Sequence, residues 1–266
     1  MKQSQFYYLL RRGLFSAGSA IIKNGLVMFN KFTTAGLNFP AQGSAEFDGA
    51  SDIINIEPAP IGAEIAITIS GWIYTPNALS GFKGIVSKGS PNGYEDFIIF
   101  GGNNGKLGFF LSTNTGDSVN LFSASNINGS VWKHFACQWD SSSNNMKIYI
   151  DGSLESTSTR TGDNVSNDDD LLSFGAYSDA SQFFDGNLAN VAIWNRALSS
   201  DEINSVMWKS YEALSGSESN GLKAWYRLDD ITSPAASLAN MEQLAADKEA
   251  TIENKAAITA AINALS

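Results

Sequence analysis

The stretch WKHFACQWDSSSNNMKIYIDGSLE, residues 132–155, decides how this chain folds. Apolar side chains that are an even number of positions apart lie on one face of a β-strand. This spacing predicts two strands whose inward faces carry Val131, Phe135, Cys137 and Trp139 in the first and Met146, Ile148 and Ile150 in the second.

Two turn signals divide this stretch. The polar run Ser141 to Asn145 separates the first strand from the second. Asp151-Gly152 follows the second strand, and this dipeptide favours a tight hairpin turn because both residue types accept positive φ at low cost. The stretch therefore predicts a three-stranded antiparallel meander on which the rest of the chain packs.

Four segments in order carry a resemblance to a known family. They are AEFDG (45–49), ISGWI (69–73), the meander itself, and FDGNLANVAIWNRALSSDEI (184–203). Together they resemble laminin-G-like and pentraxin-like domains, which are members of the concanavalin A-like lectin and glucanase superfamily. The resemblance implies an all-β fold, an antiparallel two-sheet jelly-roll sandwich.

The pattern between Ala45 and Asp230 independently favours a sandwich. Short apolar runs alternate with breaks rich in Gly, Asn and Ser, which is typical of many strands with one shared core. One exception is the segment Leu198 to Ile203, where a Ser cap precedes acidic residues and predicts a short helix. Cys137 is the chain's one cysteine and is expected to be a small core residue.

Charge and hydropathy exclude two classes of protein. The formal net charge of -10 disfavours nucleic-acid binding, which needs a basic face. The sequence contains no apolar run near the ~20 residues that a transmembrane helix requires. The negative charge is compatible with a neutral or cationic partner and with bound cations.

Composition predicts three parts: an N-terminal docking arm (1–42), the sandwich (43–233) and a C-terminal amphipathic helix (234–266). The arm contains Arg11-Arg12 before an apolar run, a layout similar to an export signal. Aromatic and aliphatic residues precede these arginines and the run is weak, so we expect the segment to belong to the working protein. The helix carries one apolar stripe, which it buries either on the sandwich or against copies of itself.

Two segments compete for one edge strand of the sandwich. NGLVMFNKF (24–32) and NGLKAWYRLD (220–229) both resemble the strand that opens many laminin-G-like domains. The sequence alone leaves both alternatives open.

The chain is not expected to be an enzyme. Glucanases of the superfamily place carboxylates close together across the scissile bond, at about 5 Å in retaining enzymes. The nearest acidic pair here is Glu95-Asp96, and adjacent residues of a strand point to opposite faces. His134 is the chain's one histidine and is expected to be structural.

The resemblance implies a calcium site formed by Glu95, Asp96 and Asp179. Pentraxin-like domains bind calcium with acidic groups before one strand and in a later loop, and YEDFIIF (94–100) and FGAYSD (174–179) resemble these segments in part. Oxygen ligands from two loops suit calcium. Tyr177 and Ser178 depart from the family pattern, and solvated loop acids are the alternative.

Sugar binding is predicted at Tyr94, Asn103, Asn104, Tyr177 and Asp179. Aromatic rings stack on sugar faces, while amides and carboxylates bind hydroxyl groups. Trp72, Trp132, Trp139 and Trp194 lie inside strand patterns and are instead expected in the core.

These features together resemble phage virion proteins with lectin-like domains. We expect a capsid decoration, neck or fibre component that assembles with other virion proteins, or with copies of itself, through its two terminal segments. Its sandwich then binds surface glycans. The alternatives are an exported bacterial surface adhesin and a protein-protein interaction module.

Overall fold

The computed structural model describes residues 43–90, 94–102, 104–112, 118–159, 165 and 171–228. Contacts divide the chain into Met1–Asn38 and Phe39–Ser266, and all described residues belong to the second unit. The predicted docking arm, the 24–32 strand and the C-terminal helix lie outside the described residues. In the part that is described, no helix is both long enough and apolar enough to cross a membrane.

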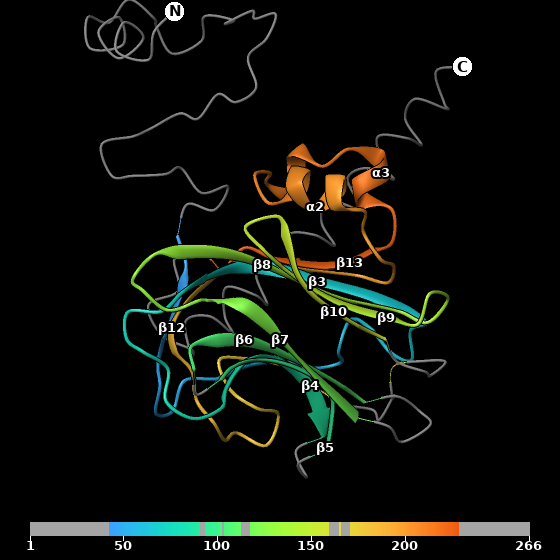
Figure 1. Ribbon diagram of the computed structural model, residues 1–266. Coiled ribbons are helices and arrows are strands. Elements are labelled where there is room, and N and C mark those ends of the chain that lie inside the picture. Colours follow the sequence, from blue (N-terminus) through green and yellow to red (C-terminus); the bar gives the residue numbers. More distant parts are fainter. Residues whose placement is uncertain are drawn as a thin grey trace, which may run out of the picture. The chain divides into compact units, whose positions relative to one another are not determined.

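Two antiparallel sheets form the sandwich (Figure 1). One sheet has the order β1-β12-β3-β8-β9-β10, with β13 also paired to β12, and the other has the order β2-β11-β4-β5-β6-β7. The strands are β1 Ala45–Asp48, β2 Ile54–Ile56, β3 Ala66–Tyr74, β4 Lys83–Ser90, β5 Tyr94–Gly101, β6 Lys106–Ser112, β7 Ser118–Asn126, β8 Trp132–Asp140, β9 Asn145–Ile150, β10 Ser153–Thr159, β11 Leu171–Phe174, β12 Asp185–Trp194 and β13 Leu222–Tyr226. The predicted all-β sandwich is confirmed.

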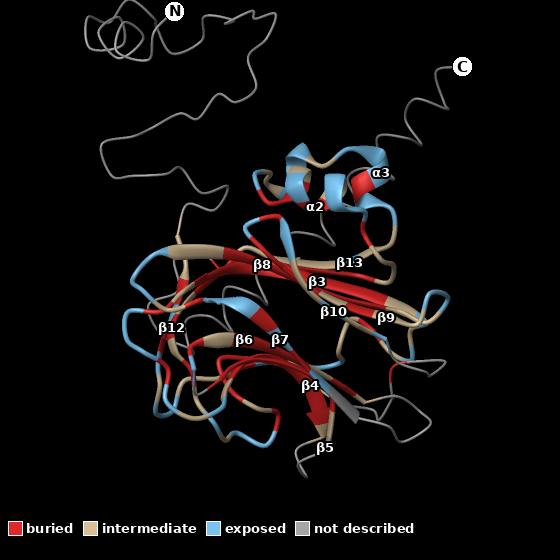
Figure 2. Cartoon of the chain, viewed as in Figure 1, coloured by how far each residue is buried: buried red, intermediate tan, exposed pale blue. Residues whose placement is uncertain are grey.

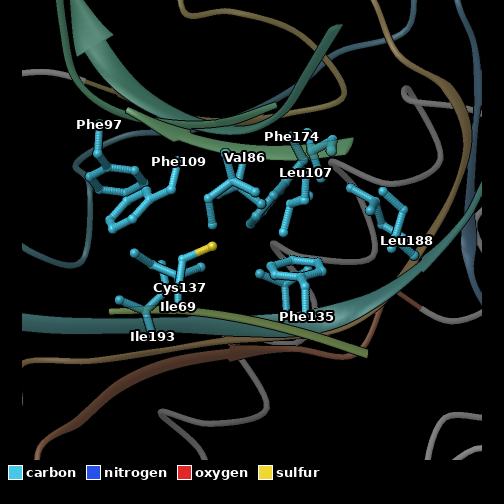
Figure 3. Packing of buried hydrophobic residues seen from close by; sticks show 14 of the residues in the cluster. Ile69, Val86, Phe97, Leu107, Phe109, Phe135, Cys137, Phe174, Leu188 and Ile193 are labelled. Atoms are coloured by element: carbon cyan, nitrogen blue, oxygen red, sulfur yellow. The ribbon is translucent and has the colours of Figure 1, made fainter. Parts of the chain in front are cut away.

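The core lies between the two sheets (Figure 3). Each sheet contributes the side chains of alternate strand positions, as its pleat dictates. Those labelled in Figure 3 are Val86, Phe97, Leu107, Phe109 and Phe174 from the six-stranded sheet and Ile69, Phe135, Cys137, Leu188 and Ile193 from the seven-stranded sheet. Burying each large apolar side chain stabilises the fold by about 1.5–3 kcal/mol.

The predicted meander is β8, β9 and β10. Asp151 and Gly152 join β9 to β10 with φ angles of 49° and 78°, as a tight primed turn requires. The predicted inward residues of both strands are buried, with one exception. Val131 is 49% exposed because β8 starts one residue later, after Ser130 with φ 54°.

A short helical segment covers part of the outer face of the seven-stranded sheet (Figure 1). It comprises α2 Ser200–Val206, the 3-10 turn η1 Tyr211–Ala213 and α3 Gly216–Ser219. Ser199 caps α2 through a capping box with Glu202, which confirms the predicted helix start. Figure 2 shows exposed residues on the outside of α2 and α3 and buried strands beneath them.

The tryptophans divide between three environments. Trp139 lies in the core between the sheets, as predicted. Trp72 and Trp194 are buried too, but on the outer face of the seven-stranded sheet, where their Nε1 atoms donate to the carbonyls of Met207 and Glu218. Trp132 is only half-buried on that face. The prediction that Trp132 belongs to the core is therefore wrong.

The edge beside β12 is formed by two strands from distant parts of the sequence. β1 pairs with Asp185 to Leu188 of β12, and β13 pairs with Val191 to Trp194. The segment 220–229 thus supplies an edge strand of the sandwich. Leu228, just beyond β13, is buried in the core.

Candidate functional site

Glu95 lies at the start of β5, beside the loop that follows β11. Its Oε1 accepts hydrogen bonds from the backbone N–H of Ser178 (3.0 Å) and from Ser178 Oγ (2.5 Å). Its Oε2 is buried and has no hydrogen-bond partner. The contact ties β5 to a loop 83 residues further along the chain.

Burial raises the pKa of Glu95 to about 7, although the Ser178 hydrogen bonds act in the opposite direction. The nearby charges of Asp179 and Asp96 raise this pKa further. Burial, with Glu95 and Asp179 close by, likewise raises the pKa of Tyr177 to about 12. The structure thus brings Glu95, Tyr177 and Asp179 into one neighbourhood. Tyr177 and Asp179 are predicted sugar-binding residues, and Glu95 and Asp179 are predicted metal ligands.

Asp96 does not join that group. Its carboxylate forms a buried ion pair with Lys88 of β4, beside the bulge that separates Lys88 from Gly89 in the β4–β5 ladder. Asp179 is exposed, and its Oδ1 accepts from the backbone N–H (3.1 Å) and Oγ (2.5 Å) of Ser181.

This arrangement does not fit the calcium ion that the resemblance implies. Across the described parts of the chain, no three His, Cys, Asp or Glu residues gather as metal ligands. Asp96 is neutralised by Lys88, and the accepting oxygen of Glu95 is occupied by Ser178. The expected convergence of Glu95, Asp96 and Asp179 as one calcium site is not found.

The predicted sugar-binding residues are divided between the two ends of β5. Tyr177 and Asp179 lie near its start, whereas Asn104 follows its end, in the turn to β6. Asn103 and the side chain of Tyr94 lie outside the described residues. Of the residues whose side chains the structure describes, Asn104 is therefore separated from Tyr177 and Asp179.

A cluster that the sequence analysis missed lies on the outer face of the six-stranded sheet. Phe100 of β5 makes edge contacts with Phe82 (centroids 5.4 Å apart) and Phe122 of β7 (5.7 Å). Phe82 is 47% exposed and Phe122 is 37% exposed. Gly108 makes room for the central ring, since a Cβ there would lie 2.3 Å from Phe100.

Asn104 lies beside this cluster. A Cβ built on Gly102 would lie 3.4 Å from Asn104 Oδ1 and 3.5 Å from the Phe122 ring, so both side chains meet above this glycine. We call Phe82, Phe100, Phe122 and Asn104 the phenylalanine patch. The alternation of β5, with Phe97 and Ile99 inward, could have placed Phe100 outside, but not the partners across the sheet.

Nothing in the described residues arranges His134 for catalysis. Its ring is buried on the outer face of the seven-stranded sheet, 5.4 Å from Trp72 in an edge contact. Burial lowers the pKa of His134 to about 3, so the ring is neutral at pH 7. The predicted structural role agrees with this placement.

Comparisons with known proteins give a consistent picture of the fold. Residues 48–204 match the sequence model of the family described as the concanavalin A-like lectin/glucanases superfamily. No curated protein matches the chain.

Many solved structures are similar to this chain, and two of them serve as examples. A SAP-like pentraxin from Limulus polyphemus is 18% identical with a TM-score of 0.50, covering 65% of this chain and 89% of the pentraxin. The CBM40 of Ruminococcus gnavus IT-sialidase, bound to α2,3 sialyllactose, is 20% identical with a TM-score of 0.54, covering 64% of this chain and all (100%) of that domain. At such identities the likeness concerns the fold alone.

Proposed function

Because the chain belongs to the concanavalin A-like lectin/glucanases superfamily, we propose that it is a non-enzymatic carbohydrate-binding protein. The observation that carries this proposal is the phenylalanine patch. Two partly exposed rings flank a buried one, and an exposed amide lies beside them. Rings that stack on a sugar and an amide that binds its hydroxyls are the two elements of a lectin site.

The arrangement of carboxylates supports a binding role over a hydrolytic one. Glu95 and Asp96 have different partners, Ser178 and Lys88, and so do not face a common substrate. Retaining hydrolysis needs two carboxyl groups about 5 Å apart across the bond to be cleaved. The lectin-type fold is in keeping with this proposal, although the fold alone does not fix function.

We place this carbohydrate-binding domain on a virion, as a capsid decoration, neck or fibre component. The support comes from the sequence, whose terminal segments 1–42 and 234–266 carry apolar residues suited to assembly. Mass spectrometry of purified particles tests this role. Absence of the protein from such particles, together with its recovery from a bacterial surface, would favour the adhesin alternative.

A glycan array tests carbohydrate binding directly. We expect the full chain to bind a subset of immobilised glycans, and Phe122→Ala or Asn104→Ala to weaken this binding about tenfold, as for the loss of a central contact. Ile65→Ala is the matched control, because Ile65 is 62% exposed and directly precedes β3 of the seven-stranded sheet, whereas the patch lies on the six-stranded sheet. An array on which the full chain binds nothing above background contradicts the proposed function.

A further inference from the structure

A row of four side chains crosses the outer face of the seven-stranded sheet, on four neighbouring strands. The register pairs Glu46 of β1 with Asn187 of β12, Asn187 with Tyr74 of β3, and Tyr74 with Trp132 of β8. We call these four residues the Tyr74–Trp132 row. At the spacing of neighbouring strands it extends about 14 Å.

All four side chains point away from the core. Their chain neighbours Phe47, Leu188 and Ile73 are fully buried between the sheets, so the alternation of the pleat turns the row outward. Glu46 is exposed, and Asn187, Tyr74 and Trp132 are half-buried. The row therefore remains accessible beside the helical segment, which covers another part of this face.

The two aromatic rings of the row are held in place from one side. Tyr74 and Trp132 lie 5.6 Å apart between centroids, with an interplanar angle of 43°. Trp132 packs against the buried cluster of Trp72, Ala189 and Met207. Rings fixed in this way lose little conformational entropy when a ligand binds.

A second accessible tryptophan stands next to this cluster. Trp208 follows α2, is 42% exposed, and lies 5.3 Å from Trp72 between ring centroids. Trp208 thus adds a third accessible aromatic ring next to the same cluster of Trp72, Ala189 and Met207 that Trp132 packs against.

The polar end of the row restricts the ligand. The Asn187 amide donates to Ser44 Oγ (3.3 Å), which orients its oxygen and nitrogen, and Glu46 places a carboxylate beside it. An apolar surface of two mutually tilted rings that ends in an amide and an acid suits a ligand with apolar ring faces and many hydroxyls. The carboxylate and the net charge of -10 disfavour acidic sugars and anionic lipid surfaces.

We infer that the Tyr74–Trp132 row is a second carbohydrate-binding surface, specific for neutral oligosaccharides. Tyr74, Trp132 and Trp208 stack on sugar rings, the Asn187 amide donates to or accepts from hydroxyls, and the Glu46 carboxylate accepts from them. This inference rests on the proposed function but concerns the opposite sheet from the phenylalanine patch. A sugar at the row contacts tryptophan, whereas a sugar at the patch contacts only phenylalanine and asparagine.

Tryptophan fluorescence therefore reports on the row and not on the patch. The full chain is titrated with neutral glucose, galactose and mannose oligosaccharides and, as the acidic counterpart, with sialyllactose. We expect at least one neutral oligosaccharide to change the emission in a saturable manner and sialyllactose to leave it unchanged.

Matched variants locate the signal. Trp132→Ala is expected to weaken the response about tenfold, and Tyr74→Phe, which keeps the ring, to weaken it less. Leu154→Ala is the control, because Leu154 is 54% exposed on β10 of the same sheet and outside the row. Glu46→Gln is expected to weaken neutral-sugar binding less than Trp132→Ala does, because the amide still hydrogen-bonds hydroxyls, and to allow sialyllactose to bind. Thermal unfolding of each variant confirms that it is folded.

The possible failures are separable. No saturable response to any neutral probe, equal responses of Trp132→Ala and Leu154→Ala, or a preference for sialyllactose would each overturn the second surface. An emission change with lipid vesicles alone would overturn it in favour of a membrane contact.

Glycan-array binding that Phe122→Ala abolishes while Trp132→Ala leaves it intact would overturn the row and leave the proposed function standing. Array binding that Trp132→Ala abolishes while Phe122→Ala leaves it intact would instead remove the patch and retain the row.

Discussion

Burial and hydrogen bonding act in opposite directions on the carboxyl group of Glu95. Burial dominates and raises the pKa of Glu95 from 4.5 to about 7. Between these two values the folded protein holds a proton that the unfolded chain releases. The free energy of unfolding therefore falls as the pH rises from about 4.5 to 7 through this group.

Replacing Glu95 with glutamine removes the free-energy cost of ionising a buried carboxyl group. The amide stays neutral, and its oxygen can still accept the Ser178 N–H. We expect Glu95→Gln to be more stable than the wild type by about 1–2 kcal/mol at pH 8, after allowing for solvent screening, and to gain much less at pH 5. Denaturant unfolding at both pH values measures the difference.

Glu46→Gln provides the control for that experiment. Glu46 is exposed on β1, so the same substitution there reports the effect of the change itself. A gain at Glu95 that is the same at pH 5 and pH 8 would show that the carboxyl group is not held protonated by its surroundings.

At the scale of elements, the β8–β9 hairpin supplies the best-defined register. Ile148 is fully buried, whereas Lys147, one position earlier on the same strand, is half-exposed and faces outward. Ile148→Asp buries an unpaired charge, and we expect it to lower the free energy of unfolding by about 3–5 kcal/mol. Lys147→Asp is the matched control and should cost less than about 1 kcal/mol. Urea unfolding of both variants tests the register, and equal losses would contradict it.

The alternation of apolar residues along β8 predicts which of its side chains face the core. Phe135, Cys137 and Trp139 were correctly placed inward by their alternation. The same alternation puts Trp132 outward, because it lies an odd number of positions from Phe135, so the expectation of a core position for Trp132 conflicts with the strand pattern. The outward position of Trp132 thus follows from the local sequence, whereas its pairing with Tyr74 depends on the register between the distant strands β3 and β8.

Other parts of the site depend on contacts between distant segments. The Glu95–Ser178 hydrogen bond joins residues 83 positions apart through loop geometry that no local pattern encodes. The resemblance implies a shared metal site for Asp96 and Glu95, yet a strand bulge and the ion pair with Lys88 give Asp96 a different environment. The separation of Asn104 from Tyr177 follows from the length of β5, at about 3.3 Å per residue.

At the scale of the whole molecule, β13 completes the sandwich late in the chain. Trp225 packs edge-on against Trp194 (6.2 Å between centroids), and Tyr226 packs against Phe174 (5.1 Å). We expect a fragment of residues 43–230 to be a folded monomer that melts close to the full chain. A fragment of residues 43–219 loses these contacts and the buried Leu228, at about 1.5–3 kcal/mol for each large side chain.

Calorimetry and size-exclusion chromatography of the two fragments test this expectation. A cooperative transition at an unchanged temperature in the shorter fragment would show that β13 is dispensable. Self-association of the longer fragment would contradict the assembly role predicted for residues 1–42 and 234–266.

The shared edge beside β12 brings the beginning and the end of the domain together. Ala45 pairs with Leu188, Tyr226 pairs with Val191, and between them the N–H of Asn190 donates to the carbonyl of Arg227 (2.9 Å). A domain whose ends are neighbours can be spliced into a surface loop of a host protein, because the loop then opens by little more than a strand spacing. The same closeness allows circular permutation, with the old ends joined by a short linker and new ends made in an exposed turn. The sandwich can therefore be inserted into another protein, or circularly permuted, without breaking the pairing of its strands.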